Sequence, residues 1–119
     1  DEKNLVAADY VGIVSGHDEP LKIQKSGFHT SKSEFVDAPV IEELPISLEC
    51  KVEEINQYNA TLRIVAEIVN VSVDEDILDS EGKIDPEKLN AISYDPANRA
   101  YLKLGGKVGT AFSDGNQLK

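Results

Sequence analysis

Two long strand patterns within residues 46–73 constrain the fold of this chain most strongly. In residues 46–52 apolar and polar side chains alternate strictly, which is typical of a strand with one buried face. After a turn at residues 57–59, a second pattern rich in valine and isoleucine covers residues 61–73. The apolar face of this second strand changes at residues 68–69. A regular strand cannot change face, so we expect a β-bulge or a sharp coil there, as in barrels.

The helical patterns are short. Residues 4–15 and residues 21–25 favour helices, which we expect to end at Gly16 and Gly27, because glycine readily adopts the left-handed conformation that stops a helix. Residues 85–89 open like a third helix, with an aspartate as its cap and a proline at the first helical position.

The remaining segments predict further β-structure and irregular connections. Residues 31–44 mix polar and apolar side chains around prolines and favour an irregular crossing segment. Residues 101–104 and 107–112 read as two short strands, joined by a tight turn at the glycines 105–106. Together the patterns predict a mainly β, barrel-like domain with a few short helices.

Composition limits the possible partners. The 119 residues fit one domain, and 40% hydrophobic with 29% charged residues is typical of a soluble globular chain. A net charge of −10 argues against binding to nucleic acid or anionic membranes, and no apolar run is long enough for a transmembrane helix. The single Cys50 favours a reducing compartment, hence a cytoplasmic location. A chain without methionine that begins at Asp1 is expected to be a processed or partial product.

No motif carries a catalytic or metal site by itself. Residues 79–85 imitate the middle of a calcium loop but lack oxygen ligands at both ends. Residues 104–110 resemble a phosphate loop but lack its first glycine and its serine or threonine. Residues 15–18 contain a serine, a histidine and an aspartate, the residue types of a hydrolytic triad, but only as neighbours in a turn. The members of such a triad come together from distant segments. We therefore expect no catalytic side chain and no metal.

Short stretches spread along the chain carry a family resemblance. They are residues 8–16 (ADYVGIVSG), 25–28 (KSGF), 36–43 (VDAPVIEE), 48–52 (LECKV), 66–74 (AEIVNVSVD), 94–96 (YDP) and 101–109 (YLKLGGKVG). Together and in this order they resemble the flavin reductase-like, or flavoredoxin, family. The resemblance covers nearly the whole chain, although no single stretch is diagnostic.

The resemblance implies a split β-barrel of Greek-key type that binds FMN, usually as a homodimer with the flavin near the interface. It also implies a further N-terminal portion that supplies the first barrel strands. We expect residues 1–119 to form a single incomplete domain that lacks those strands. Such a chain pairs with the missing segment, swaps strands with another copy, or is a remnant that does not bind flavin.

Four residues are candidates for flavin contacts on the strength of the resemblance. Lys22 corresponds to a lysine that meets the FMN phosphate, and Thr61 replaces a histidine near the flavin. Tyr94 and Tyr101 are candidates for packing against the isoalloxazine ring. The alternatives are a solvated surface lysine and tyrosines that fill a core poor in aromatic residues.

The resemblance implies a flavin-mediated redox function, in which the flavin does the chemistry and no side chain need act as acid or base. The leading hypothesis is an FMN-binding oxidoreductase that takes reducing equivalents from NADH, NADPH or a redox partner. The alternatives are a non-enzymatic flavin electron carrier and a cofactor-free structural remnant.

Overall fold

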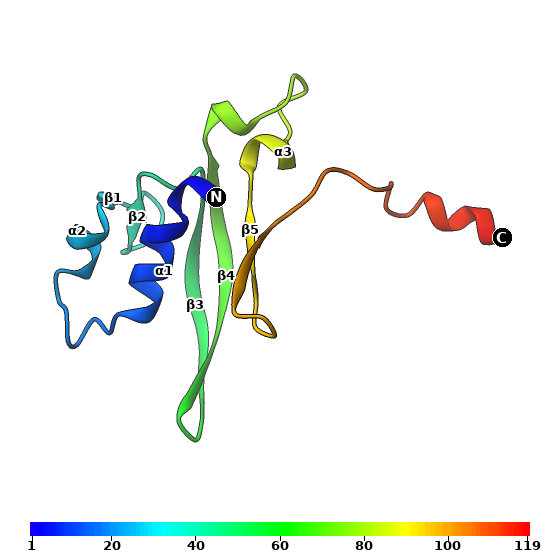
Figure 1. Ribbon diagram of the computed structural model, residues 1–119. Coiled ribbons are helices and arrows are strands. Elements are labelled where there is room, and N and C mark those ends of the chain that lie inside the picture. The colour runs from blue at the N-terminus through cyan, green and yellow to red at the C-terminus, as the bar shows by residue number, and fades with distance from the viewer.

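A long antiparallel hairpin dominates the computed structural model, which describes residues 1–119 (Figure 1). Its strands are β3 (Ile46–Tyr58) and β4 (Thr61–Val73), paired from Tyr58 opposite Thr61 to Ile46 opposite Val73. The second strand has the predicted bounds, and the first continues beyond the predicted end. Asn59, which has a φ of 53°, and Ala60 connect them.

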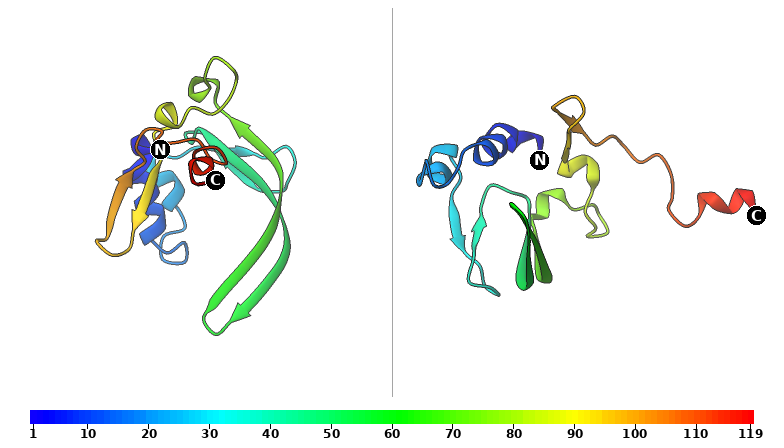
Figure 2. Two further views of the ribbon diagram at one scale, coloured as in Figure 1. Left: turned by 90° about the vertical axis from the view of Figure 1, so that its right-hand side faces the viewer. Right: turned by 90° about the horizontal axis from the view of Figure 1, so that it is seen from below.

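The predicted bulge lies where the apolar pattern changes face. Glu49 pairs with Asn70 whereas Cys50 pairs with Ile68, so Val69 is the extra residue in β4. A second irregularity in β3 leaves Glu53 as an extra residue between Val52 and Glu54. Bulges bend a strand pair and increase its twist, and the hairpin is visibly curved along its length (Figure 2).

The two bulges keep the apolar side chains on one face of the hairpin. Directly paired residues of an antiparallel ladder point to the same side. With the observed register, one face, which we call the apolar face, carries Ile46, Leu48, Cys50, Val52, Ile55, Leu62, Ile64, Ala66, Ile68, Val71 and Val73. The opposite face is almost entirely polar. A regular register would have turned half of the apolar residues to the polar side.

Two shorter hairpins complete the β-structure. Strands β1 (Thr30–Lys32) and β2 (Pro39–Ile41) pair antiparallel, so the segment expected to be irregular contains a small hairpin. Strands β5 (Ile92–Asp95) and β6 (Ala100–Lys103) form the third two-stranded sheet. A mainly β chain with short helices is confirmed, and its three sheets stay open instead of closing into a barrel.

The predicted strand at residues 107–112 is wrong. The C-terminal hairpin instead turns at residues 96–99, where the Asp95 carboxylate accepts hydrogen bonds from the Ala97 backbone N–H at 2.9 Å and from the Asn98 side-chain amide at 2.6 Å. These local bonds fix the turn before residues 105–106, which leaves residues 107–112 without a partner strand.

The helices are short, and two of their three predicted ends are confirmed. Helix α2 (Lys22–Ser26) ends at Gly27 with a φ of 84°. Asp85 caps α3 (Pro86–Leu89) through the N–H groups of Glu87 and Lys88. Three 3₁₀ turns, η1 (Glu2–Asn4), η2 (Glu75–Ile77) and η3 (Asp114–Leu118), add to these.

The prediction that a left-handed Gly16 ends helix α1 (Leu5–Ile13) is wrong. Gly16 is not left-handed, and Val14 ends the helix in an extended conformation. The Lys22 ammonium donates to the carbonyl oxygens of Val11 and Val14, both at 3.0 Å. A cation at these carbonyls satisfies the end of the helix and complements its dipole, so no left-handed glycine is needed.

The chain exposes far more surface than a closed domain of its mass. Its accessible surface is 9574 Å², whereas a compact 13.0 kDa monomer exposes about 6,300 Å². Its radius of gyration is 17.6 Å, against about 13.5 Å for a compact domain of this length. Only Asn4, Phe28, Ser33, Glu49 and Ile77 are buried, and the apolar face is mostly exposed. None of the helices has the length and hydrophobicity of a membrane-spanning segment.

The turn of the long hairpin gives a direct test of this geometry. Asn59→Val should lower the free energy of unfolding by about 1–2 kcal/mol, because a β-branched side chain is strained at positive φ. Asn59→Gly, which relieves the strain, should be close to neutral. Urea unfolding measures both variants, and equal stabilities would contradict the left-handed assignment.

Candidate functional site

Helix α1 positions the predicted phosphate-binding lysine. Lys22 begins α2 and reaches back to α1, where it donates to the Val11 and Val14 carbonyls. An ammonium group has three N–H donors. Two are used by α1, so one remains for an oxygen ligand at the surface, where Lys22 is half-buried.

The same helix holds the two predicted tyrosines. Tyr94 and Tyr101 are direct partners across β5 and β6, with ring centroids 5.6 Å apart and ring planes tilted by 54°. Tyr101 Oη donates to Asp9 Oδ1 of α1 at 2.7 Å. This bond to the Asp9 carboxylate raises the pKa of the Tyr101 phenol above its usual 10.0, since the phenol donates only while it is protonated.

Three of the four predicted residues are therefore linked to helix α1, and we call Lys22, Tyr94 and Tyr101 the α1 cluster. Lys22 contacts the end of α1 directly, Tyr101 contacts it through Asp9, and Tyr94 lies against Tyr101. Thr61 is not part of this cluster. It lies at the tip of the β3–β4 hairpin, which extends beyond the helices (Figure 1), and no side-chain hydrogen bond joins it to the other three.

Asp9 is a site residue that the sequence analysis missed. A signal was present, because Asp9 is the only charged residue in the helix sequence LVAADYVGI. An acidic side chain in an otherwise apolar and aromatic helix indicates a specific partner. That partner, Tyr101, is 92 positions away, so local sequence patterns could not supply it.

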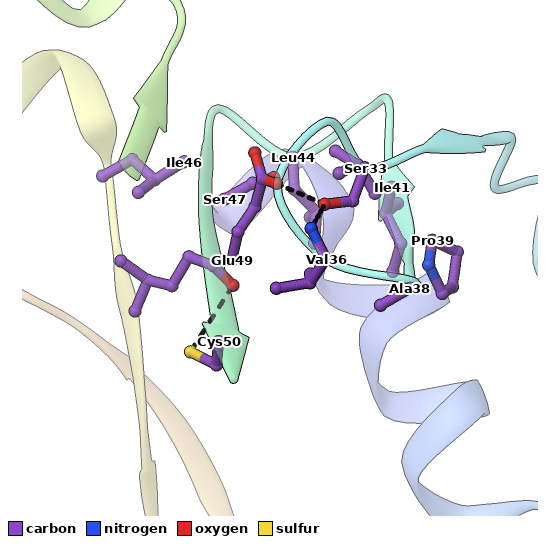
Figure 3. A pocket seen from close by; sticks show the side chains of 12 residues that line it. Ser33, Val36, Ala38, Pro39, Ile41, Leu44, Ile46, Ser47, Glu49 and Cys50 are labelled. Atoms are coloured by element: carbon purple, nitrogen blue, oxygen red, sulfur yellow. Dashed lines mark hydrogen bonds between the residues drawn. The ribbon is translucent and has the colours of Figure 1, made fainter. Parts of the chain in front are cut away.

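A cavity of about 350 Å³ lies between β2, the preceding loop and the start of β3 (Figure 3). It is lined mainly by apolar side chains, among them Val36, Ile41 and Leu44. Cys50 is at its rim, with an exposed thiol. None of the four predicted residues lines this or another cavity of the chain.

Two buried polar residues, Glu49 and Ser33, line this cavity, and Glu49 carries the charge. Its carboxylate accepts hydrogen bonds from the Ser33 hydroxyl, from the Phe35 backbone N–H at 2.9 Å and from the Asn70 amide at 2.9 Å. These donors, Ser33 foremost, hold the pKa of Glu49 below its usual 4.5. The strand pattern had put Glu49 on the solvent face, but the loop at residues 33–38 folds over that face and buries it to 6% exposure.

The two regions suit different ligand chemistry. The α1 cluster combines a cation that has one free donor with two exposed aromatic rings. Such a set can hold an anionic group and pack against a flat ring. The Glu49 carboxylate, by contrast, is already satisfied by donors of the chain, so the cavity mainly offers apolar contact.

Comparison with known proteins identifies the family. The family model described as "Flavin reductase like domain" matches residues 1–95. The chain belongs to the flavin reductase-like family. The α1 cluster lies within this match except for Tyr101 of β6. None of the curated proteins compared with the chain matches it.

Solved structures with the same fold include two flavoredoxins. The chain is 33% identical to the flavoredoxin of Desulfovibrio vulgaris (Miyazaki F), with a TM-score of 0.86 over 95% of this chain. It is 32% identical to the flavoredoxin from Methanosarcina acetivorans, with a TM-score of 0.80 over 93%. Nitrilotriacetate monooxygenase component B from Bacillus cereus shares the fold at 24% identity, with a TM-score of 0.75 over 92%.

The chain is shorter than these relatives. It spans 60% of the D. vulgaris flavoredoxin, 57% of the M. acetivorans flavoredoxin and 56% of the B. cereus protein. The chain thus corresponds to only part of each of these structures. It is in this shorter chain that the sheets are open and the apolar face is exposed.

Glu49 should make stability depend on acid pH. Because its folded pKa is depressed, its contribution is complete above the ordinary pKa of 4.5 and is lost as the pH falls through the lower folded value. Glu49→Gln should lower the urea midpoint at neutral pH and reduce the change in midpoint between about pH 5 and 3.

The exposed Glu53 provides the matched control, since its side chain makes no hydrogen bond in the structure. Glu53→Gln should leave both the midpoint and its pH dependence close to those of the unchanged chain. If Glu49→Gln behaved in the same way as this control, the loop contacts of Glu49 would not stabilise the fold.

Proposed function

We propose that the chain is the flavin-binding part of an FMN-dependent oxidoreductase. The observation that carries the proposal is the α1 cluster, in a chain that belongs to the flavin reductase-like family. Lys22 and Tyr101 bond to α1, and Tyr94 lies against Tyr101. Flavoredoxins at 33% and 32% identity support a flavin-related redox role.

The residues of the cluster fit FMN in part. The free N–H of Lys22 would donate to a phosphate oxygen as a charge-assisted hydrogen bond. The exposed rings of Tyr94 and Tyr101 would lie against the isoalloxazine. Thr61 serves as a contact to the same flavin only if a second copy brings its hairpin tip to α1. Bound flavin would supply the redox chemistry by accepting and passing on reducing equivalents.

The cluster needs another surface to become a closed site, because none of its residues lines a cavity of the single chain. The exposed apolar face points to the same conclusion. We propose that residues 1–119 are part of one split-barrel domain of Greek-key type, completed by a preceding N-terminal segment. We also propose a homodimer with the flavin near the interface and a cytoplasmic location, in keeping with the single free Cys50.

Two other functions remain candidates. The similarity to flavoredoxins favours a flavin electron carrier that does not itself oxidise a nicotinamide cofactor. The separation of Thr61 from the α1 cluster favours a cofactor-free remnant of the fold.

Steady-state kinetics separates these functions. With added FMN, the proposed oxidoreductase should oxidise NADH or NADPH at a rate proportional to protein concentration, followed by absorbance at 340 nm. An electron carrier should retain FMN after desalting without oxidising either nicotinamide. A chain that retains no flavin and oxidises neither donor would contradict both redox functions.

Lys22→Ala should weaken FMN binding about tenfold or more, since a charge-assisted hydrogen bond to phosphate is lost. Riboflavin, which has no phosphate, should bind the variant and the unchanged chain equally. This comparison separates a phosphate contact from a general loosening of α1, which Lys22 also caps. Fluorescence titration with both flavins gives the two affinities.

Lys25→Ala is the matched control for Lys22→Ala. Lys25 lies on the same helix, α2, but its ammonium forms an ion pair with Glu19 and does not bond to α1. Its loss should leave FMN affinity unchanged within about twofold, a difference of less than 0.5 kcal/mol. The phosphate assignment is wrong if the two variants lose FMN affinity to the same extent, or if Lys22→Ala weakens riboflavin as much as FMN.

A further inference from the structure

The last thirteen residues, 107–119, form an arm that leaves the rest of the chain after β6. Figure 1 and the right panel of Figure 2 show the arm leading away from the three hairpins, with the C-terminus at its far end. Every residue of the arm is exposed. Its large apolar side chains, Val108, Phe112 and Leu118, have relative exposures of 104%, 105% and 94%.

The arm has local structure of its own. The Asp114 carboxylate accepts a hydrogen bond from the Thr110 backbone N–H at 2.8 Å, and the Asp114 N–H donates to the Thr110 carbonyl at 3.2 Å. The turn continues into η3 and holds Phe112 at a φ of 62°. Gly109 permits this closure, because a Cβ there would lie 2.5 Å from Asp114 Oδ2. The turn thus presents Phe112 outward in a preformed conformation.

A preformed aromatic side chain that projects fully into water is unfavourable for a free chain and favourable at an interface. Because the arm leads away from the three hairpins, none of the hairpins of its own chain receives Phe112. We propose that the arm docks onto a second copy of this chain, with Phe112 as its apolar anchor. This proposal rests on the homodimer of the proposed function and adds the element that holds it together.

Charge agrees with a second copy as the partner. The side chains of the arm include Lys107, Asp114 and Lys119, a sum of +1. The other 106 residues contain 10 basic and 21 acidic residues, a sum of −11. Residues 1–106 of two copies repel each other because both are acidic. The arm, which does not carry their negative charge, can approach residues 1–106 of the other copy.

The exposed area is also sufficient. The chain exposes 9574 Å², roughly 3,000 Å² more than a compact monomer of its mass, and a second copy would share this surface with the preceding segment of the proposed function. A stable interface buries about 800 Å² on each partner. In a two-fold dimer each copy gives one arm and receives one, so the same contact forms twice.

The test measures dimerisation by sedimentation in the absence of flavin, so its result is independent of the flavin proposal. Phe112→Asp should raise the dimer dissociation constant at least tenfold. Phe35→Asp is the matched control, because Phe35 is an exposed aromatic residue in the loop at residues 33–38, outside α1 and outside the arm, and the substitution introduces the same charge. This control should dimerise like the unchanged chain.

Photo-crosslinking supplies a second measurement on the folded chain. A benzophenone amino acid in place of Phe112 should give, on irradiation, a product of two chains of 13.0 kDa each. A crosslink within one chain would overturn the proposal, because the arm would then fold back on its own hairpins. A dimer that Phe112→Asp leaves intact would also overturn it, while the homodimer itself would stand. An unchanged chain that stays monomeric would overturn both.

Discussion

The apolar face of the β3–β4 hairpin governs how the other segments of this chain can pack. Two bulges, at Val69 and Glu53, keep its valine, isoleucine and leucine side chains on one side over the full length of both strands. A surface of this size is stable only when another layer covers it. The short hairpins and helices of the chain leave most of it exposed, which is the reason for proposing that a preceding segment covers it.

Helix α1 has the corresponding role for the candidate site. It is too short to be stable alone, and two of the candidate site residues, Lys22 and Tyr101, bond to it. Lys22 occupies its final carbonyls, and Tyr101 reaches Asp9 near its middle. The same contacts that fix the helix therefore place a cation and an aromatic pair around it, which couples the local stability of α1 to flavin binding in the proposed function.

Local patterns predicted the elements whose cause lies within a few residues. The β4 strand, its bulge near Val69, the glycine end of α2 and the aspartate cap of α3 are all of this kind. The predictions at Gly16 and at residues 107–112 were wrong because distant or competing partners decided the outcome. The resemblance to the flavin reductase-like family supplied Lys22, Tyr94 and Tyr101, which no local motif indicated.

The amphipathic strands, the helix ends with local caps and the family can all be recognised in the amino-acid sequence. The burial of Glu49, the bond between Asp9 and Tyr101, the capping of α1 by Lys22 and the distant position of Thr61 emerge only from the folded chain. The two groups differ in the range of the interactions that cause them. Periodicity and capping act between neighbours in the chain, whereas burial and side-chain pairing depend on which distant segments fold against one another.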